Sequence, residues 1–462
     1  MILATSLFVL AFAFGPLLWA PMSEFYGRRY PLLIGFFLSP IFQIPVAVAH
    51  DVATIMICRF FAGFFGSSPF ATAGGVLADI WPPVERGIAM AAFASATFVL
   101  GENSIVLTAA KGPVMGPIIG GFITESYLGW RWTEWITVIM GLTLSVIALL
   151  CVPETSPARI LTLRAQRLRV ETKQWELHAA AEETLLDPRA LLTTYFSKPF
   201  AMLLLEPILI LFTVYMSTVY GILYLFLEAF PISFQQQRGW SLGVGALPFL
   251  SLIVGVVIGA AFAVWYTRAV IAPKAKRDGG LLPEDRLVPM VVGGVLLPAG
   301  LFWFAWTSSP DIIWAPQVLA GVPIGAGIIM IFMQGLTYIV DVYLWHANSA
   351  LAANGILRAF FGAGFPLFAT TMYQSLGVAW ASSLLAFLTV AMVPAPLLFL
   401  RFGARIRSWS RYSPKNRPDT PPQPSERSGR SSAFQMRRLS RGESKRNSRA
   451  MSTRIRDEQS SV

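Results

Sequence analysis

Charged residues, histidine and cysteine are all scarce in this chain of 462 residues. Asp, Glu, Lys and Arg make up 13% of the sequence and hydrophobic residues 55%, a balance that is typical of an integral membrane protein and not of a soluble core. Cys58 and Cys151 lie within apolar runs and the three histidines are scattered, so we expect neither a disulfide framework nor a metal site. Loops without paired acids or histidines predict no catalytic residues, and hence no enzyme.

The net charge of +11 is confined to the C-terminus. Residues 1–400 hold 20 basic and 20 acidic residues, whereas residues 401–462 hold 16 basic and five acidic ones. We therefore expect no nucleic-acid partner; a solvated tail near anionic lipid of the cytoplasmic leaflet fits this charge better. Serines that follow basic residues, as in Arg438-Leu439-Ser440, make a kinase a candidate partner of the tail.

Apolar runs of about 20 residues, each long enough to cross a bilayer as a helix, recur along the chain. They predict an all-α integral membrane protein with about 11 transmembrane helices. The first run has no basic residues before it and no small-residue cleavage site, so we expect no signal peptide. The expected spans are residues 2–20, 31–49, 54–78, 88–123, 132–152, 201–226, 243–267, 287–307, 312–338, 350–374 and 379–400.

Five of these spans precede a long polar stretch and six follow it, which predicts four parts. They are an N-terminal transmembrane bundle (1–152), an inner linker (153–200), a C-terminal transmembrane bundle (201–400) and a disordered basic tail (401–462). Leucines and a tryptophan that recur every seven residues in the linker predict an amphipathic helix along the inner face. A loose charged linker is the alternative.

Arg28 and Arg29 stand in a short polar hinge between the first two runs. Arginine is favoured on the cytoplasmic side of membranes, so placing these two inside determines the side of every later loop. The inner side then collects the basic linker, the basic residues of 268–286 and the tail, while the outer loops hold only Arg131 and Arg238. We therefore expect a cytoplasmic C-terminus, and the plasma membrane as the location.

The hinge, residues 21–33, resembles the loop signature of the major facilitator superfamily, G-x-L-a-D-r-x-G-r-k-x-x-l. Gly27, Arg28 and Arg29 match it, whereas Glu24 stands where aspartate is expected and alanine replaces the first glycine. These departures are similar to those of the fungal-type twelve-helix drug/proton antiporters. The resemblance implies a fold of two helical bundles, and it implies that Glu24, Arg28 and Arg29 brace the closed inner gate.

A second motif is a segment rich in glycine and proline within the fourth run. Glycines four residues apart let helices approach closely and proline kinks a helix, so a helix-packing face is one interpretation. The segment also resembles the antiporter signature G-x-x-x-G-P-x-x-G-G, which implies antiport and not symport. Its members are Gly112, Pro113, Gly116, Pro117, Gly120 and Gly121.

Arg59 lies inside the third run, where an arginine must face a cavity or a partner. It resembles the arginine that the family ties to proton transfer, and snorkelling to the outer interface is the alternative. Its usual acidic neighbour would belong to a helix before Ile2. An odd number of spans also predicts such a missing helix, through a truncated gene model; a native protein that begins outside the membrane is the alternative.

The fourth run is too long for a single span because its middle, residues 101–111, is polar and charged. Glu102 and Lys111 would lie at membrane depth, which is costly. Unremoved intron sequence is our favoured interpretation, and a real bulge is the alternative.

In the second half, Glu206 is the best remaining carboxylate for proton binding, and a position near the inner interface is the alternative. Tyr215, Tyr220 and Tyr224 follow it and resemble the fungal branch's Y-x-x-x-x-Y-G-x-x-Y pattern. Aromatic faces with hydroxyl groups suit a cavity for amphipathic or cationic substrates. An interfacial aromatic belt is the alternative.

Asp341, Asn354 and Arg358 surround an inner turn and also resemble this branch. Asn354 is assigned to the substrate pathway. We hypothesise that an ion pair between Asp341 and Arg358 closes the inner gate, and two solvated loop charges are the alternative.

Together these features predict a monomeric secondary transporter that exports drug-like compounds or polyamines by proton antiport through alternating access. The proton is the coupling ion and no cofactor is expected; the partners are the small-molecule substrate and the lipid bilayer. A non-transporting truncated remnant is one alternative, and a symporter or uniporter of the same fold is another.

Leucine in place of Gly116 should abolish export while leaving membrane insertion intact, because the larger side chain blocks close helix approach. Drug accumulation in expressing cells measures export, and an epitope tag measures insertion. Retained export at normal expression would contradict the antiporter assignment.

Overall fold

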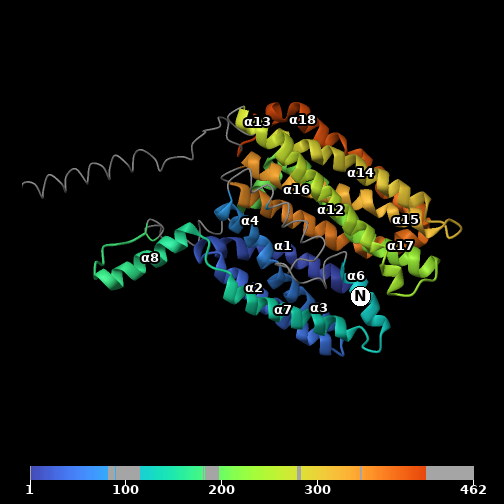
Figure 1. Cartoon of the computed structure of the whole chain (residues 1–462), viewed down its shortest axis with the longest axis horizontal. Coiled ribbons are helices and arrows are strands. Elements are labelled where there is room, and N and C mark those ends of the chain that lie inside the picture. The colour runs from blue at the N-terminus through green and yellow to red at the C-terminus, as the bar shows by residue number, and fades with distance from the viewer. Residues whose placement is uncertain are drawn as a thin grey trace, which may run out of the picture. The chain divides into compact units, whose positions relative to one another are not determined.

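The computed structural model describes residues 2–81, 89, 115–179, 182, 197–277, 282–343 and 346–412. Every regular element in these ranges is a helix, as the apolar runs predict. Figure 1 shows most of the helices packed lengthwise against one another, while α8 extends away from the rest. The described part of the chain is therefore all-α.

The N-terminal helices form one group, coloured blue to cyan in Figure 1. They are α1 (Ile2–Phe25), α2 (Arg29–Val48), α3 (Val52–Gly66), α4 (Ser68–Ile80), α6 (Met115–Glu125) and α7 (Arg131–Cys151). Gly27, with a φ of 90°, makes the turn between α1 and α2. Asp51 caps α3 by accepting a 2.7 Å hydrogen bond from the Thr54 amide. That hydrogen bond also lowers the pKa of the Asp51 carboxyl.

The linker contains the helix that the sequence predicts, α8 (Pro157–Thr172). The Ser156 hydroxyl caps its first turn by accepting from the Arg159 amide at 3.5 Å. Lys173 ends the helix in the left-handed conformation. Leu161 is exposed on α8, so the helix does not bury its apolar residues within the described chain.

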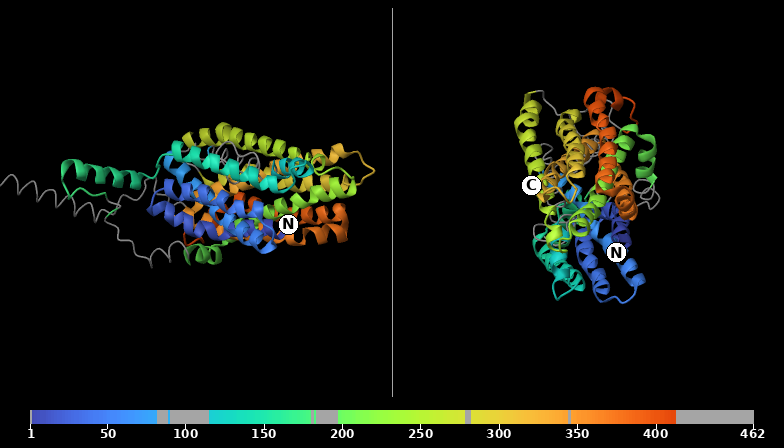
Figure 2. Two further views of the ribbon diagram at one scale, coloured as in Figure 1. Left: turned by 90° about the horizontal axis from the view of Figure 1, so that it is seen from below. Right: turned by 90° about the vertical axis from the view of Figure 1, so that its right-hand side faces the viewer.

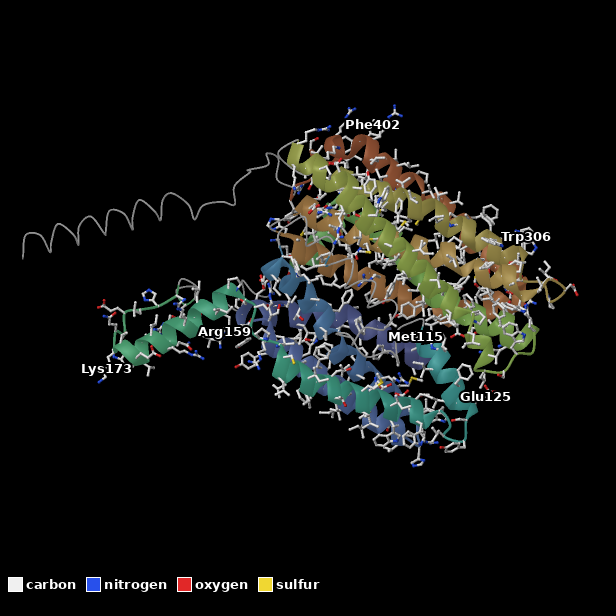
Figure 3. All side chains as sticks on the ribbon, in the orientation of Figure 1. Met115, Glu125, Arg159, Lys173, Trp306 and Phe402 are labelled. Atoms are coloured by element: carbon white, nitrogen blue, oxygen red, sulfur yellow. The ribbon has the colours of Figure 1, made fainter. Side chains whose placement is uncertain are left out.

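The C-terminal helices form the second group. They are α10 (Lys198–Leu205), α11 (Pro207–Phe230), η3 (Pro231–Gln237), η4 (Val244–Ala246), α12 (Phe249–Tyr266), η5 (Thr267–Ile271), α13 (Ala272–Arg277), η6 (Pro283–Arg286), α14 (Leu287–Trp306), α15 (Trp314–Leu319), α16 (Gly321–Tyr343), α17 (Ala347–Met392) and α18 (Pro394–Arg407). Gly377, with φ 75° and ψ 163°, divides α17 into two helices. Trp306 of α14 and Phe402 of α18 mark opposite ends of this group in Figure 3.

Nine helical segments of the described chain are long and apolar enough to span a membrane. The last, residues 349–403, contains two of the expected spans because the turn at Gly377 separates them. Ten of the eleven expected spans therefore coincide with such segments. Only α6 of the expected span 88–123 is described continuously, and residues 101–111 lie outside the described residues. The chain also stays ordered beyond 400, since α18 runs to Arg407 and the described part ends at Tyr412; the expected start of the tail at 401 was wrong.

The two groups lie side by side, with the blue-to-cyan helices on one side and the green-to-red helices on the other (Figure 2). The helix α1 packs against the first part of α17, where Phe12 and Ala13 form a buried cluster with Ile356 and Ala359. Ile118 of α6 joins the large core of the C-terminal group. Both contacts bring helices that are distant in sequence together at the boundary between the groups.

Glycines let the C-terminal helices touch closely. A Cβ atom on Gly259 of α12 would lie 2.6 Å from Ile329 Cγ2 and 2.8 Å from the Ala326 carbonyl oxygen of α16. A Cβ atom on Gly293 of α14 would lie 2.9 Å from the Gly327 carbonyl oxygen, also on α16. Close packing of this kind holds helices together in lipid, where the hydrophobic effect contributes little to their association.

Alanine in place of Gly259 should lower stability by about 1–3 kcal/mol because the added methyl group overlaps α16. Gly364 is the matched control, since a Cβ atom there would have no other atom within 4 Å. Gly364→Ala should leave stability unchanged or slightly raised, because alanine is the better helix former. Thermal unfolding of the purified chain in detergent measures both. Equal melting temperatures for the two variants would contradict the packing of α12 on α16.

Candidate functional site

The two arginines of the first hinge are held by carboxylates from elsewhere in the N-terminal group. Arg28 Nε donates to Asp79 Oδ2 of α4 at 3.1 Å, and its amide donates to Glu154 Oε1 at 2.8 Å. The Arg29 amide donates to the other oxygen of Glu154 at 3.3 Å. A Cβ atom on Gly75 would overlap the Arg28 guanidinium, so glycine leaves room for this ion pair. The hinge is thereby tied to α4 and to the chain after α7.

Sequence reasoning missed both acidic partners of this hinge. Glu24, which it assigned there, is half-buried, but the carboxylates bonded to Arg28 are Asp79 and Glu154. A signal for them was present, because each lies where an apolar run ends. An acidic residue at a helix end is a natural partner for a basic hinge at the same end of the bundle.

Arg59 of α3 has an acidic partner within the chain. It pairs with Glu134 of α7, whose side chain is only 4% exposed. Sequence reasoning expected its neighbour on a helix before Ile2 and overlooked Glu134 in the first turn of α7. The pair compensates a buried carboxylate, which would be costly if it were left alone.

Part of the glycine- and proline-rich motif forms α6, which touches the C-terminal group. Gly116, Pro117, Gly120 and Gly121 lie in this helix, and Gly112 and Pro113 lie outside the described residues. A Cβ atom on Gly121 would lie 2.7 Å from the Leu242 carbonyl oxygen. At the end of α6, labelled in Figure 3, the Glu125 carboxylate accepts hydrogen bonds from the Ser241 hydroxyl at 3.1 Å and the Gly243 amide at 3.0 Å. The motif therefore joins the two groups at the end opposite Arg28.

The tyrosines of α11 have different surroundings. The Tyr220 and Tyr224 hydroxyls are 3.2 Å apart, and both rings are buried. A Cβ atom on Gly294 would lie 3.1 Å from the Tyr215 hydroxyl, which places that tyrosine against α14. The three expected pathway tyrosines thus divide into a pair, Tyr220 and Tyr224, and a separate packing residue.

Arg358 of α17 is surrounded by aromatic side chains from three other helices. Its guanidinium carbon is 4.9 Å from the centroid of Phe70, 5.0 Å from that of Tyr220 and 5.7 Å from that of Phe332. These rings belong to α4, α11 and α16, so Arg358 stands at the boundary between the N-terminal and C-terminal groups. We call these four residues the Arg358 cluster.

The expected ion pair between Asp341 and Arg358 is not formed, and that hypothesis was wrong for this structure. Asp341 Oδ2 lies 2.5 Å from Arg286 Nε, whose side chain is 3% exposed. The reason is position along the helices. Asp341 lies in the last turn of α16 and reaches Arg286 of η6. Arg358 lies three turns into α17 and meets aromatic rings instead.

Asn354 is one turn before Arg358 on α17 and is fully buried. Its Nδ2 atom donates to Thr213 Oγ1 at 3.4 Å and approaches Met216 Sδ at 3.7 Å. Its Oδ1 atom has no hydrogen-bond partner among the described residues, and the same holds for Gln334 Oε1 of α16. A buried acceptor without a donor is costly and marks a place where a ligand can donate a hydrogen bond.

Glu206 stands at the break between α10 and α11 and is fully buried. Its carboxylate accepts hydrogen bonds from the hydroxyls of Ser410 at 2.6 Å and Tyr343 at 3.1 Å. It also accepts from the amides of Arg411 at 2.8 Å and Tyr412 at 3.2 Å. We call Glu206 and residues 408–412 the C-terminal latch. These four donors favour a structural role over the expected proton-carrying role.

A second contact supports the latch. The His346 ring meets the Tyr412 ring edge-on with centroids 5.5 Å apart. Lys198 Nζ lies 2.9 Å from His346 Nδ1. The start of α10, the start of α17 and the end of the described chain therefore meet at one place.

Comparison with known proteins agrees with this architecture. The sequence profile of the Major Facilitator Superfamily matches residues 1–344. The citrinin biosynthesis cluster MFS transporter mrr1 of Monascus ruber is 54% identical over 416 residues, which cover 90% of this chain and 81% of that protein. The MFS-type transporter traF of Penicillium crustosum is 50% identical over 412 residues, covering 89% and 81% respectively.

A more distant yeast relative and a solved structure were also found. The uncharacterized transporter C36.03c of Schizosaccharomyces pombe is 48% identical over 412 residues, covering 89% of this chain and 74% of that protein. The crystal structure of the human organic anion transporter MFSD10 superposes with a TM-score of 0.56 at 15% identity, covering 86% of this chain and 83% of that one. At this identity the likeness establishes the fold alone.

Ending the chain at Arg407 should destabilise the protein, because it removes three of the four donors to Glu206. Ending it at Ser413 should leave stability unchanged, since every latch residue is kept. We expect Glu206→Gln to behave like the shorter chain, with a loss of about 1–3 kcal/mol, because an amide cannot accept all four hydrogen bonds. Thermal unfolding in detergent measures all three. Equal stability of the two truncated chains would show that the latch contributes nothing.

Proposed function

Because this chain belongs to the Major Facilitator Superfamily, we propose that it is a secondary active exporter that moves small organic compounds across the membrane in exchange for protons. Like its relatives, the chain is a membrane transporter and not an enzyme. The finer assignment to antiport rests on the motif in α6. We place the protein in the plasma membrane with the Arg28 end and the C-terminus in the cytoplasm, as the basic loops favour.

The contact of α6 with residues 241–243 is the observation that carries the proposal. Alternating access requires two groups of helices that rock about a shared site and close at one end at a time. Gly121 and Glu125 supply such a closure at the end opposite Arg28, where Glu125 accepts hydrogen bonds from Ser241 and Gly243. This contact supports the proposal, because under alternating access the two groups would separate at this end during release.

Of the two expected substrate classes, drug-like organic compounds fit better than polyamines. The Arg358 cluster places a positive charge at the boundary between the groups, and a polyamine would be repelled by it. The relative from Monascus ruber also favours this class, since it is named for the citrinin biosynthesis cluster. A biosynthetic product is a small organic compound.

Glu228 is the best candidate for the proton site. It follows Tyr220 and Tyr224 at four-residue spacing, so the three side chains share one face of α11. It is half-buried, unlike Glu206, whose carboxylate is fully occupied by the C-terminal latch. Sequence reasoning missed Glu228, although its spacing from the tyrosine pair was a usable signal.

Collapsing the pH gradient should raise dye accumulation in cells that express the chain, because export then loses its energy source. Neutral, anionic and cationic fluorescent dyes should be tested together. Glu228→Gln should give the high accumulation even with the gradient intact, since an amide cannot carry the proton. Glu171→Gln, on the exposed surface of α8, is the matched control and should export normally. Export that ignores the gradient would remove proton coupling from the proposal.

A further inference from the structure

Arg358 is a buried arginine of α17 that has no counter-ion among the described residues. Only 8% of the surface of Arg358 is exposed. Arg28, Arg59 and Arg286 each lie within a salt bridge to Asp or Glu. Over the ranges that the structure describes, the Arg358 guanidinium has neither a carboxylate partner nor a hydrogen bond, and its contacts are with three aromatic rings.

The three rings compensate only part of the cost of this buried charge. A cation over an aromatic face is attracted by the ring quadrupole, but less strongly than by a carboxylate in a desolvated site. The guanidinium presents five donors in a planar fork, which fits a carboxylate with two parallel hydrogen bonds. An anion from outside the chain would supply the missing charge and accept those hydrogen bonds.

We propose that the transported compound is an aromatic organic acid that binds as its anion at the Arg358 cluster. This inference rests on the proposed transport function and names its substrate class. The carboxylate of the compound pairs with Arg358, and its ring packs beside Phe70, Tyr220 and Phe332. Because Phe70 comes from α4 and the other two rings from α11 and α16, the ligand contacts both helical groups and can couple their movement.

One polar group near the cluster extends the description of the ligand. Asn354 Oδ1 is a buried acceptor without a described partner, and Asn354 lies one turn from Arg358 on the same helix. A hydroxyl group on the ring of the ligand would donate to such an acceptor. The chemistry of the site therefore favours hydroxylated aromatic carboxylates over unsubstituted ones.

The same geometry argues against cationic ligands. The face of Tyr220 that would attract a cation already carries the Arg358 guanidinium at 5.0 Å. Of the amphipathic or cationic substrates that the sequence led us to expect at these aromatic faces, the proposal therefore keeps amphipathic compounds and replaces cations with anions.

Equilibrium dialysis of the purified full chain in detergent tests this charge preference. The probes are benzoate, 2-naphthoate and 3-hydroxy-2-naphthoate, each beside its primary amide, together with spermidine. The wild-type chain should bind the carboxylates at least about tenfold more tightly than the amides, as expected for a hydrogen-bonded charge pair. Arg358→Gln should abolish this preference, and Arg358→Lys should retain part of it because lysine keeps the charge but loses the fork.

Arg401→Gln is the matched control. Arg401 also stacks on a ring, Phe402 at 5.7 Å, but it is exposed on α18, so its loss should leave the carboxylate preference unchanged. Size-exclusion chromatography shows whether each variant is folded. A further variant, Phe70→Leu, tests the site without removing a charge. This variant should weaken binding of the naphthoates more than binding of benzoate.

Three results would overturn the proposal. They are equal binding of carboxylates and amides, tighter binding of spermidine, and no carboxylate binding at all. Uptake of the same probes into proteoliposomes under a pH gradient separates this inference from the proposed function. Uptake of amides or spermidine alone would leave export standing and remove the anion preference. Binding that depends on Arg358 without any uptake would leave the anion site standing and remove export.

Discussion

The cost of an unpaired charge in an apolar surrounding determines how this chain is arranged. Several salt bridges inside the helical groups join segments that are far apart in sequence, as Arg28 joins Asp79 and Arg59 joins Glu134. Hydrophobic burial drives little association between helices in lipid, so these pairs and close glycine contacts specify which helices meet. Arg358 is the informative exception, since the described chain offers it only aromatic rings.

The same ion pair occurs once in each helical group. Arg28 directly precedes α2 and pairs with Asp79 near the end of α4, and Arg286 directly precedes α14 and pairs with Asp341 near the end of α16. Both pairs join the start of one helix to the end of a later helix in the same group. The first hinge was recognisable from its motif. Its counterpart carries no such motif and becomes visible only through the contact.

Glu206 illustrates how position changes the meaning of a residue type. A carboxylate next to an apolar run is, by composition, a candidate for proton transfer. Here its oxygens are occupied by Ser410, Tyr343 and two backbone amides, which makes it an anchor for the end of α18. Glu228, near the end of α11, shares a face with Tyr220 and Tyr224 instead, which is why we propose it as the proton site.

The sequence by itself determined the membrane class and ten of the expected spans, because apolar length is a local property. It also singled out Arg28, Arg59 and Arg358 as candidate site residues. Only the tertiary structure decided the partners: Asp79 and Glu154 for Arg28, Glu134 for Arg59, Arg286 for Asp341, and aromatic rings for Arg358. Partner choice depends on which helices pack together and how far along each helix a residue lies. Neither the helix packing nor the relative position along two helices can be read from a single run of residues.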